Sequence, residues 1–342
     1  MKQIDFRSDT VTLPTKEMMA AITAAPLGDD VYDEDPTVNT LQQKAAEMFD
    51  KEAALLVCSG TMGNICCTVG HTNRGDEIIL EKNSHIFLHE VGASAVIGGL
   101  QLRTIPGKDG YLITPQQLQN AIRGEDLHYP RTALVCIENT HNLAGGKIWS
   151  KKQIDAVAKI AHDNSVKVHI DGARIFNASI ALDIPVGKLT KNADSIMFCL
   201  SKGLACPIGS MIVGSEEFIT KAKRVRKMLG GGMRQAGIIA APGIVALDSM
   251  INRLADDHAN AQKLANGLAK IEGIKVRDCP TNLLYIDIAG LNIAPLDLKK
   301  KLKKRGIIIS TRWSTIIRLV THYGITEADI DYTLSVFKEL FS

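Results

Sequence analysis

Short apolar segments alternate with amphipathic helical segments through the first two thirds of the chain. Seven segments have the length and apolar content of buried strands: residues 53–58, 77–80, 101–105, 133–137, 166–170, 195–200 and 208–213. Helices are predicted around them, at residues 16–25, from 37 onward, 115–121, 151–162 and 215–228. Strands separated by helices in this rhythm predict an α/β fold with a mostly parallel sheet covered on both faces.

The pattern changes after residue 235. Two long helices, at about 236–250 and 253–271, lead away from the predicted sheet. From residue 275 a small α+β unit follows, with strands at 283–288, 307–309 and 316–320 and helices at 295–305 and 326–341. Because 342 residues are many for one core, we predict a large domain at 1–250, which includes an N-terminal arm, and a small C-terminal domain at 251–342.

One lysine follows the apolar segment 195–200, in the turn before the next strand. An apolar strand has no packing reason to end in an ammonium group, because lysine is seldom buried without a partner. In a partly dry cleft more of a lysine is free amine, the form that makes a Schiff base with a carbonyl. Lys202 is therefore a candidate nucleophile, with an ordinary lysine at a strand end as the alternative.

An aspartate ends the preceding strand-like segment. Asp171 follows residues 166–170, so a parallel sheet would place it and Lys202 at one carboxyl edge, where open α/β sheets bind ligands. Pyridoxal 5'-phosphate requires both groups, an amine for its aldehyde and a carboxylate that keeps its pyridine nitrogen protonated. The pair predicts this cofactor. A helix N-cap is the competing interpretation of Asp171.

A turn of small residues joins the segment 53–58 to a helix. Ser59, Gly60, Thr61 and Met62 would present free N–H groups and the positive helix end to an anion. We predict the cofactor phosphate at this turn, with a simple helix cap as the alternative. The turn matches neither GxxxxGK[ST] nor GxGxxG, which disfavours nucleoside triphosphates and NAD.

Histidines supply further candidates. His85 and His89 lie one helical turn apart, but no third ligand with metal-site spacing lies nearby, so no metal is predicted. A flat imidazole stacked on a pyridoxal ring suits His85, with His89 nearer the substrate. Solvated helix positions are the alternative, more so for His89. His128, in the loop before residues 133–137, is a further neighbour.

Composition narrows the class of protein. Hydrophobic residues make up 45% and charged residues 23% of the chain, ordinary values for a globular protein. A formal net charge of +3 disfavours nucleic acid as a partner, and the absence of a long apolar segment disfavours a membrane. The chain has seven cysteines without CxxC spacing and shows no secretory signal. These features indicate that the protein resides in the reducing cytoplasm.

The chain resembles the low-specificity L-threonine aldolases, pyridoxal-phosphate enzymes of the aspartate-aminotransferase fold (fold type I). The resemblance runs nearly end to end, through DFRSDTVTLPT, GDDVYDEDPTVN, CSGTMGN, SHIF, IENTHN, HIDGARIFNAS, CLSKGLACPIGS, RKMLGGGMRQAG and IRLVTH. It implies a seven-stranded sheet, a lyase that cleaves L-threonine and L-allo-threonine to glycine and acetaldehyde, and a cytoplasmic homotetramer built as a dimer of dimers. It also implies a role in threonine catabolism and glycine biosynthesis.

The resemblance also implies roles for single residues. Lys202 forms the Schiff base, Asp171 holds the pyridine nitrogen and His85 stacks on the ring. The other implied binding residues are Ser59, Gly60, Thr61 and Met62 for phosphate, Ser8, Tyr32, Arg174 and Arg318 for substrate, Arg174 also for the cofactor, and Lys227 and Arg234 from a partner subunit near the phosphate. The proton acceptor for the β-hydroxyl stays open among His85, His89, His128 and an ordered water.

Two positions depart from the family pattern. Tyr32-Asp33-Glu34 replaces the usual tyrosine-glycine-glutamate, and His89 stands where tyrosine or phenylalanine is common. The preference between threonine and allo-threonine is therefore not predicted. The alternatives are another fold-type-I lyase or transaminase for a small amino acid, and a pyridoxal-binding protein without turnover. Arg174 and Arg318 disfavour the latter, since a protein that only binds pyridoxal phosphate needs no arginines to bind a substrate carboxylate.

Overall fold

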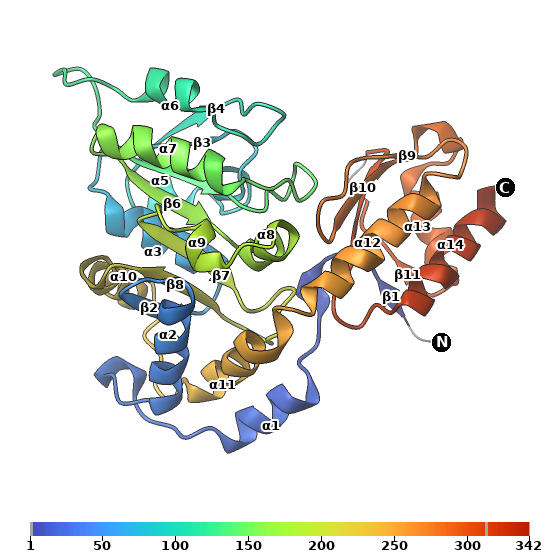
Figure 1. The fold of residues 1–342 in the computed structure, drawn as a ribbon, viewed down its shortest axis with the longest axis horizontal. Helices are drawn as coiled ribbons and strands as arrows, with labels where there is room; N and C mark the ends of the chain where they lie inside the picture. Colours follow the sequence, from blue (N-terminus) through green and yellow to red (C-terminus); the bar gives the residue numbers. More distant parts are fainter. Residues whose placement is uncertain (1–2, 312–313, 342) are drawn as a thin grey trace.

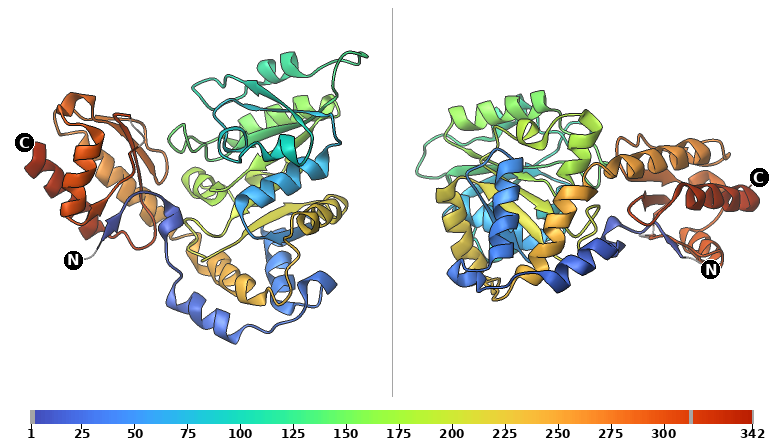
Figure 2. Two further views of the ribbon diagram at one scale, coloured as in Figure 1. Left: turned by 180° about the vertical axis from the view of Figure 1, so that it is seen from behind. Right: turned by 60° about the horizontal axis from the view of Figure 1, so that its bottom comes forward.

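The computed structural model describes residues 3–311 and 314–341, which form a large lobe and a small lobe. Helix α12 (Leu254–Leu268) runs out of the large lobe into the small one, and the N-terminal arm crosses beside it (Figure 1). Figure 2 shows the two lobes side by side from two further directions.

A seven-stranded sheet forms the centre of the large lobe, as expected from the apolar pattern. Its strand order is β2-β8-β7-β6-β5-β3-β4. The strands are β2 (Ala53–Val57), β3 (Glu77–Glu81), β4 (Gln101–Ile105), β5 (Thr132–Glu138), β6 (Lys167–Asp171), β7 (Ser195–Cys199) and β8 (Ser210–Gly214). All neighbours are parallel except β8, which runs antiparallel to both β2 and β7. The predicted mostly parallel sheet is confirmed.

Helices cover both faces of this sheet. The helices of the large lobe are α1 (Lys16–Ala24), α2 (Pro36–Met48), α3 (Gly60–His71), α4 (His85–Leu88), α5 (Ala93–Val96), α6 (Pro115–Ala121), α7 (Lys151–Asp163), α8 (Ile175–Leu182), α9 (Val186–Leu189), α10 (Glu216–Met228) and α11 (Gly237–Val245), which the π-helical segment η3 (Ala246–Met250) continues, with the short 3-10 turns η1 (Asp9–Val11) and η2 (Asp30–Tyr32). Helices α6 and α7 each begin with a reciprocal capping box, made by Thr114 with Gln117 and by Ser150 with Gln153.

The apolar core fills one face of the central strands. Ile170 of β6 and Phe198 of β7 are buried there, and the Phe198 ring stacks on Phe49 with 4.9 Å between centroids and 11° between planes. Burial of each such side chain contributes about 1.5–3 kcal/mol. Alternate positions on the same strands point to the opposite face, under α3, where a second apolar cluster that includes Met197 and Ile212 surrounds the buried polar residues His169, Asp171 and Ser195. Apolar packing on both faces therefore holds the sheet, and the polar residues lie within it on the α3 side.

The small lobe has its own core. Strands β10 (Leu283–Asp287), β12 (Ile316–Val320) and β9 (Lys275–Val276) form an antiparallel sheet, packed by α12, α13 (Pro295–Lys304) and α14 (Glu327–Phe341), with a short turn η4 (Ala289–Leu291). The N-terminal strand β1 (Ile4–Asp5) pairs in parallel with β11 (Ile307–Ile308), and Ile4 and Phe6 are buried in the same apolar cluster. The arm is thus part of the small lobe's packing. The division at residue 250 stays a prediction.

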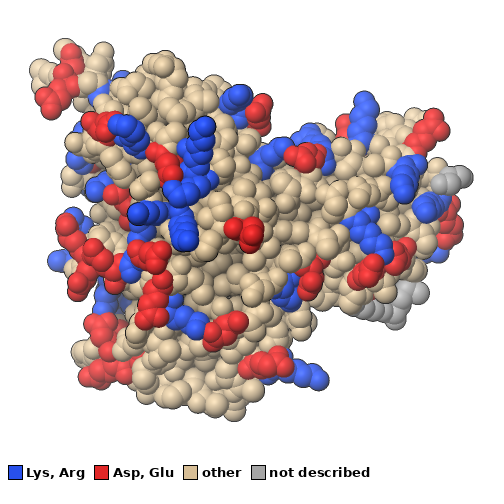
Figure 3. All heavy atoms as spheres, in the orientation of Figure 1, with Lys and Arg blue, Asp and Glu red and all other residues tan. Residues whose placement is uncertain are grey.

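Two surface properties bear on the partners of the protein. On the face drawn in Figure 3, Lys and Arg side chains lie among Asp and Glu side chains over both lobes. Within residues 3–311 and 314–341 no single helix has the length and apolar content to cross a membrane. One pair of helical segments, 237–250 with 254–268, meets that test together and is bent by 65°.

Candidate active site

Three strand ends meet at the carboxyl edge of the sheet. Glu138, the last residue of β5, lies beside Asp171, the last residue of β6, and Asp171 lies beside Met197 of β7. Strand β7 ends at Cys199, and Lys202 follows in the turn that leads to β8. The structure therefore brings Asp171 and Lys202 to one edge of two adjacent strands, the usual ligand position of an α/β sheet.

The Asp171 carboxylate is buried and held by two donors. The backbone N–H of Ala173 donates to Oδ1 at 3.2 Å, and the Asn64 side-chain amide donates to Oδ2 at 3.0 Å. The residue that caps α8 is Arg174, so Asp171 is not the N-cap of that helix. A buried acid fixed by two donors keeps one orientation, as a partner for a ring nitrogen must.

The start of α3 forms an anion cradle against β7. Ser59 caps the helix, and its Oγ accepts from the Met62 N–H at 3.2 Å. The N–H groups of Gly60 and Thr61 come before the first intrahelical hydrogen bond, so they point outward with the positive helix end. A Cβ on Gly60 would lie 2.9 Å from the Cys199 sulfur. Glycine therefore lets the cradle approach the strand that leads to Lys202.

His85 lies at the same edge of the sheet. Its backbone N–H donates to Glu138 Oε2 at 2.7 Å, and its Nδ1 shares a 2.9 Å hydrogen bond with Glu90 Oε1. Burial lowers the pKa of His85, but the Glu90 hydrogen bond and the charge of Asp171 outweigh it, so that the pKa lies above its ordinary value. The His89 ring lies 5.5 Å from the His85 ring between centroids. The two histidines thus occupy one site.

The turn that carries Lys202 is tied to the N-terminal arm. The Thr12 hydroxyl donates to the Lys202 carbonyl at 3.0 Å. The positive charge of Lys202 contributes to the lowered pKa of Asp9 and acts against the protonation of His85. The Lys202 amine is therefore within electrostatic reach of both the arm and the histidine.

Two arginines gather around Asp9 between the lobes. Arg174 donates from Nε and Nη2 to the two carboxylate oxygens, each at 2.7 Å. Arg318 of β12 donates from Nη1 to Asn142 Oδ1 at 2.6 Å. The Ser8 hydroxyl lies 3.4 Å from Asp9. Burial alone would raise the pKa of Asp9, but Arg174, Lys202 and Arg318 hold it well below its usual range. The three residues predicted to hold a substrate carboxylate thus lie together.

Four predicted site residues are exposed or have partners outside the Asp171–Lys202 edge. His128 is 83% exposed and pairs with Asp126 in the loop that precedes β5, at the opposite edge of the sheet. Tyr32 is 70% exposed in η2. Arg234 pairs with Asp29 at 2.9 Å, and Lys227 lies at the end of α10. His128 therefore lies away from Lys202 in one chain, whereas the turn after α10 lies against the cradle, since a Cβ on Gly231 would be 2.6 Å from the Met62 sulfur.

The departure at position 33 has a structural counterpart. Asp33 has a φ of 60° and a ψ of 25°, the left-handed conformation that favours glycine. Its carboxylate pairs with Lys223 of α10. This ion pair holds the loop next to Tyr32 in a backbone shape that glycine adopts without strain.

Sequence reasoning missed five residues that shape the site. They are Asp9, Asn64, Glu90, Asn142 and His169, each of which positions a predicted residue or one of its partners. A signal was present for two of them. Asn64 lies in the first turns of the helix after the predicted cradle, and His169 lies two residues before Asp171, on the same strand face.

Among the described residues, His85, Glu90 and Asp171 form a group whose ligand-type atoms lie within 4.8 Å of one another. Hydrogen bonds already join these atoms: Asn64 donates to both carboxylates, and His85 bonds to Glu90. The group is a hydrogen-bonded network, and its place beside Lys202 and the cradle fits pyridoxal 5'-phosphate. An amine, a fixed acid, a flat imidazole and an anion site all face one edge.

The sheet order, the antiparallel β8 and the site at the carboxyl edge define an enzyme of the aspartate-aminotransferase-like fold, fold type I. A solved threonine aldolase from Leishmania major has a TM-score of 0.85 at 18% identity, covering 99% of this chain and 100% of that chain. An alanine–glyoxylate aminotransferase from Nostoc has a TM-score of 0.75 at 13% identity, covering 99% and 95%.

Sequence comparison identifies the family. The beta-eliminating lyase family model matches residues 5–290. Low-specificity L-threonine aldolase 1 of Arabidopsis thaliana is 45% identical over 99% of this chain and 96% of its own length. Low specificity L-threonine aldolase of Escherichia coli K12 is 41% identical over 96% of each. The chain belongs to the low-specificity L-threonine aldolase family of lyases, and the resemblance noted in the sequence is confirmed.

Proposed function

We propose that the protein cleaves L-threonine and L-allo-threonine to glycine and acetaldehyde with pyridoxal 5'-phosphate as its cofactor. The observation that carries this proposal is the meeting of Asp171, Lys202 and the α3 cradle at one edge of the sheet. The names of the relatives that match over nearly the whole chain support the same reaction.

In this proposal each functional group of the cofactor has a residue that binds it. Lys202 would hold the aldehyde through its amine, Asp171 would accept from the pyridine N–H, and the His85 ring would pack against the pyridine. The phosphate sits on the N–H groups of Ser59 to Met62 at the start of α3. When bound, the cofactor supplies an electron acceptor for the bond that breaks at the substrate Cα.

The protein orients the substrate. Ser8, Arg174 and Arg318 hold its carboxylate, and this grip turns the Cα–Cβ bond toward the direction in which its electrons are accepted. A base must also remove the β-hydroxyl proton. His89 is the imidazole next to His85, whereas His128 would have to come from another copy because it lies at the opposite edge of the sheet in one chain, so both stay candidates beside His85 and an ordered water.

We propose a homotetramer, a dimer of dimers, as the working form in the cytoplasm. Large apolar side chains are exposed around the arm and α10, with Leu13 76%, Tyr32 70% and Met228 63% exposed. A neighbouring copy would cover this surface and bring Lys227 and Arg234 to the phosphate of the adjacent site. The domain division at 250 and a role in threonine catabolism and glycine biosynthesis belong to the same proposal.

The test is cleavage of the four threonine stereoisomers by the cofactor-loaded protein, with glycine and acetaldehyde measured separately. We expect both L-isomers to be cleaved and neither D-isomer, with no keto acid required. Rapid turnover of D-threonine would overturn the assignment. Product formation only with a keto-acid acceptor would favour a transaminase, and no turnover despite a cofactor spectrum would favour a binding protein.

A further inference from the structure

Helix α3 and strand β6 place polar side chains against each other in the interior. Asn64 and His71 are seven residues apart and lie on one stripe of α3, while His169 and Asp171 are two apart and share one face of β6. Asn64, His169 and Asp171 are 1%, 0% and 3% exposed. Buried polar groups are costly unless each has a partner, so their hydrogen bonds can be followed one by one.

These side chains form an unbroken series of hydrogen bonds. The His71 Nε2 lies 2.8 Å from the Ser195 Oγ, and the Ser195 Oγ lies 2.9 Å from the His169 Nδ1. The His169 Nε2 lies 3.1 Å from the Asn64 Oδ1, and the Asn64 Nδ2 lies 3.0 Å from the Asp171 Oδ2. We call these four residues behind Asp171, namely His71, Ser195, His169 and Asn64, the α3 relay.

The carboxylate fixes the direction of every bond in the α3 relay. A carboxylate only accepts, so the Asn64 amide nitrogen donates to Asp171 and its oxygen must accept from His169 Nε2–H. With its proton on Nε2, a neutral His169 accepts at Nδ1 from the Ser195 hydroxyl. The Ser195 oxygen then accepts from His71 Nε2–H. Every donor in the series points toward Asp171.

The environment keeps both histidines neutral, as this series requires. Burial lowers the pKa of His169 to about 4 and is the main cause that lowers the pKa of His71 to about 3. Bonds aligned in one direction polarise one another, so the relay presents a dipole with its positive end at the Asp171 oxygen.

Asn64 also joins the two sides of the cofactor site. The same Nδ2 donates to Glu90 Oε1 at 2.7 Å, and that oxygen is 2.9 Å from the His85 Nδ1. The Asn64 amide thus holds Asp171, the proposed partner of the pyridine nitrogen. It also holds Glu90, which bonds to the His85 ring proposed to stack on the cofactor.

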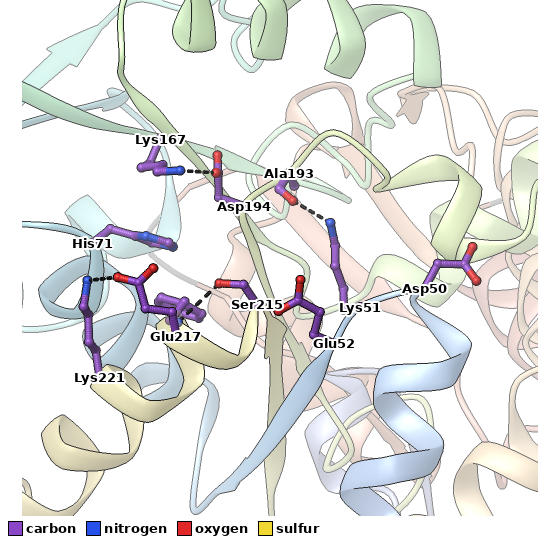
Figure 4. A pocket seen from close by; sticks show the side chains of 12 residues that line it. Asp50, Lys51, Glu52, His71, Lys167, Ala193, Asp194, Ser215, Glu217 and Lys221 are labelled. Atoms are coloured by element: carbon purple, nitrogen blue, oxygen red, sulfur yellow. Dashed lines mark hydrogen bonds and ion pairs between the residues drawn. The ribbon is translucent and has the colours of Figure 1, made fainter.

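The relay ends at the opposite edge of the sheet. His71 lies in a cavity of about 430 Å³ lined by Lys167, Asp194 and Glu217 (Figure 4). Its ring stacks on Phe218 with 4.1 Å between centroids and 7° between planes. The stacked ring fixes the outer end of the relay, so the series runs from this cavity to Asp171 between α3 and the sheet.

We propose that Asn64 and His169 are positioning residues that, through the α3 relay, keep Asp171 an oriented anion and so keep the pyridine nitrogen of the bound cofactor protonated. This inference rests on the proposed binding of pyridoxal 5'-phosphate at Asp171 and Lys202, and not on the identity of the amino acid that is cleaved.

The test uses Asn64→Leu and His169→Phe, reconstituted with pyridoxal phosphate that carries ¹⁵N in its ring. Loss of a hydrogen bond to a charged group predicts cofactor binding weaker by about tenfold or more. We also expect the ¹⁵N resonance to move toward that of an unprotonated pyridine. His169→Gln, which keeps one donor and one acceptor, should recover most of both signals, and Ser195→Ala should show the same changes at smaller size.

The matched control is His258→Phe. His258 also bonds through Nε2 to an asparagine oxygen, that of Asn177 at 2.9 Å, but it lies outside the relay. We expect wild-type affinity and a wild-type ¹⁵N resonance for this variant. If Asn64→Leu does not fold, His169→Phe and Ser195→Ala carry the test.

An unchanged ¹⁵N resonance in His169→Phe would overturn the proposal, whether or not the affinity falls, because lost packing changes affinity without deprotonating the ring. Neither readout requires threonine cleavage. A wild-type protein that binds the cofactor without cleaving threonine would therefore refute the proposed reaction and leave this inference intact.

Discussion

Arg174 and Asp9 form a buried two-pronged ion pair between segments 165 residues apart in the chain, with both N···O distances at 2.7 Å. Asp9 belongs to the arm that pairs with the small lobe, and Arg174 follows the strand that ends in Asp171. The pair therefore fixes the arm to the candidate site. It also fixes the direction of the guanidinium that we propose for the substrate carboxylate.

Replacement of Asp9 by alanine leaves the Arg174 charge buried without a partner. We expect the free energy of unfolding of Asp9→Ala to fall by about 3–5 kcal/mol. In the double variant Asp9→Ala/Arg174→Met the buried charge is gone. Its free energy of unfolding should therefore fall by less than the sum of the decreases in Asp9→Ala and Arg174→Met. Urea unfolding of the four proteins measures the coupling, and strictly additive losses would contradict it.

Lys202→Ala removes the amine at the end of β7. We expect turnover of threonine to fall by about 10³-fold or more, because no other group replaces a Schiff-base lysine. Lys221→Ala is the control, since Lys221 is 57% exposed at the opposite edge of the sheet. The measurement is acetaldehyde release at saturating threonine. Comparable rates for the two variants would show that Lys202 is not the nucleophile.

Arg318→Gln removes the proposed carboxylate partner on β12. We expect KM for threonine to rise by about tenfold to a hundredfold, the range for loss of a charged hydrogen bond. Asn142→Ala should raise KM less, because it removes only the oxygen that orients Arg318 at 2.6 Å. Arg277→Gln, whose side chain stacks on Tyr285 in the same lobe, is the control. An unchanged KM in Arg318→Gln would exclude its role.

Glu90→Gln changes the protonation of His85. The Glu90 carboxylate is among the groups that raise the pKa of His85 against the effect of burial, so a neutral amide should lower that pKa. The His85 ring resonances in an NMR pH titration measure the shift directly. Glu81→Gln is the matched control, because it should lower the pKa of His141 and not that of His85. A higher pKa for His85 in Glu90→Gln would contradict the assignment.

His258 should make stability depend on pH in a defined window. Burial lowers its pKa to about 4 in the folded protein, against about 6.5 in an unfolded chain. Between these values only the unfolded chain takes up the proton, so this contribution to stability is lost as the pH falls from about 6.5 to about 4. The free energy of unfolding of the wild type should fall relative to His258→Phe by about 1.4 kcal/mol per pH unit. Denaturant unfolding at pH 7, 6 and 5 measures this difference, and a constant difference would refute it.

Much of the fold follows from the sequence, because buried strands are apolar on both faces and helices carry their own start signals. The segments predicted at 195–200 and 151–162 correspond to β7 (Ser195–Cys199) and α7 (Lys151–Asp163). The direction of β8 could not be predicted, since an apolar segment looks the same in either direction. The helix predicted at about 236–250 is α11 continued by the π-helical segment η3, with Pro242 inside α11.

The placement of Asp171 and Lys202 at one edge was predictable, because in each case a polar residue follows an apolar strand. It was not predictable where two distant segments meet, because nothing near Asp9 in the sequence points to Arg174. Asn64 and His169 form an intermediate case. Their spacing shows that each faces the sheet interior, but only the packing of α3 on β6 shows that they bond to each other.

Strand β1 has a consequence for synthesis of the protein. Ile4 pairs with Ile307, so strand β1 leaves the ribosome about three hundred residues before its partner strand is made. At translation rates of about 5–20 residues per second this delay is of order a quarter of a minute to a minute. The large lobe can fold during that interval, before the arm pairs with the small lobe.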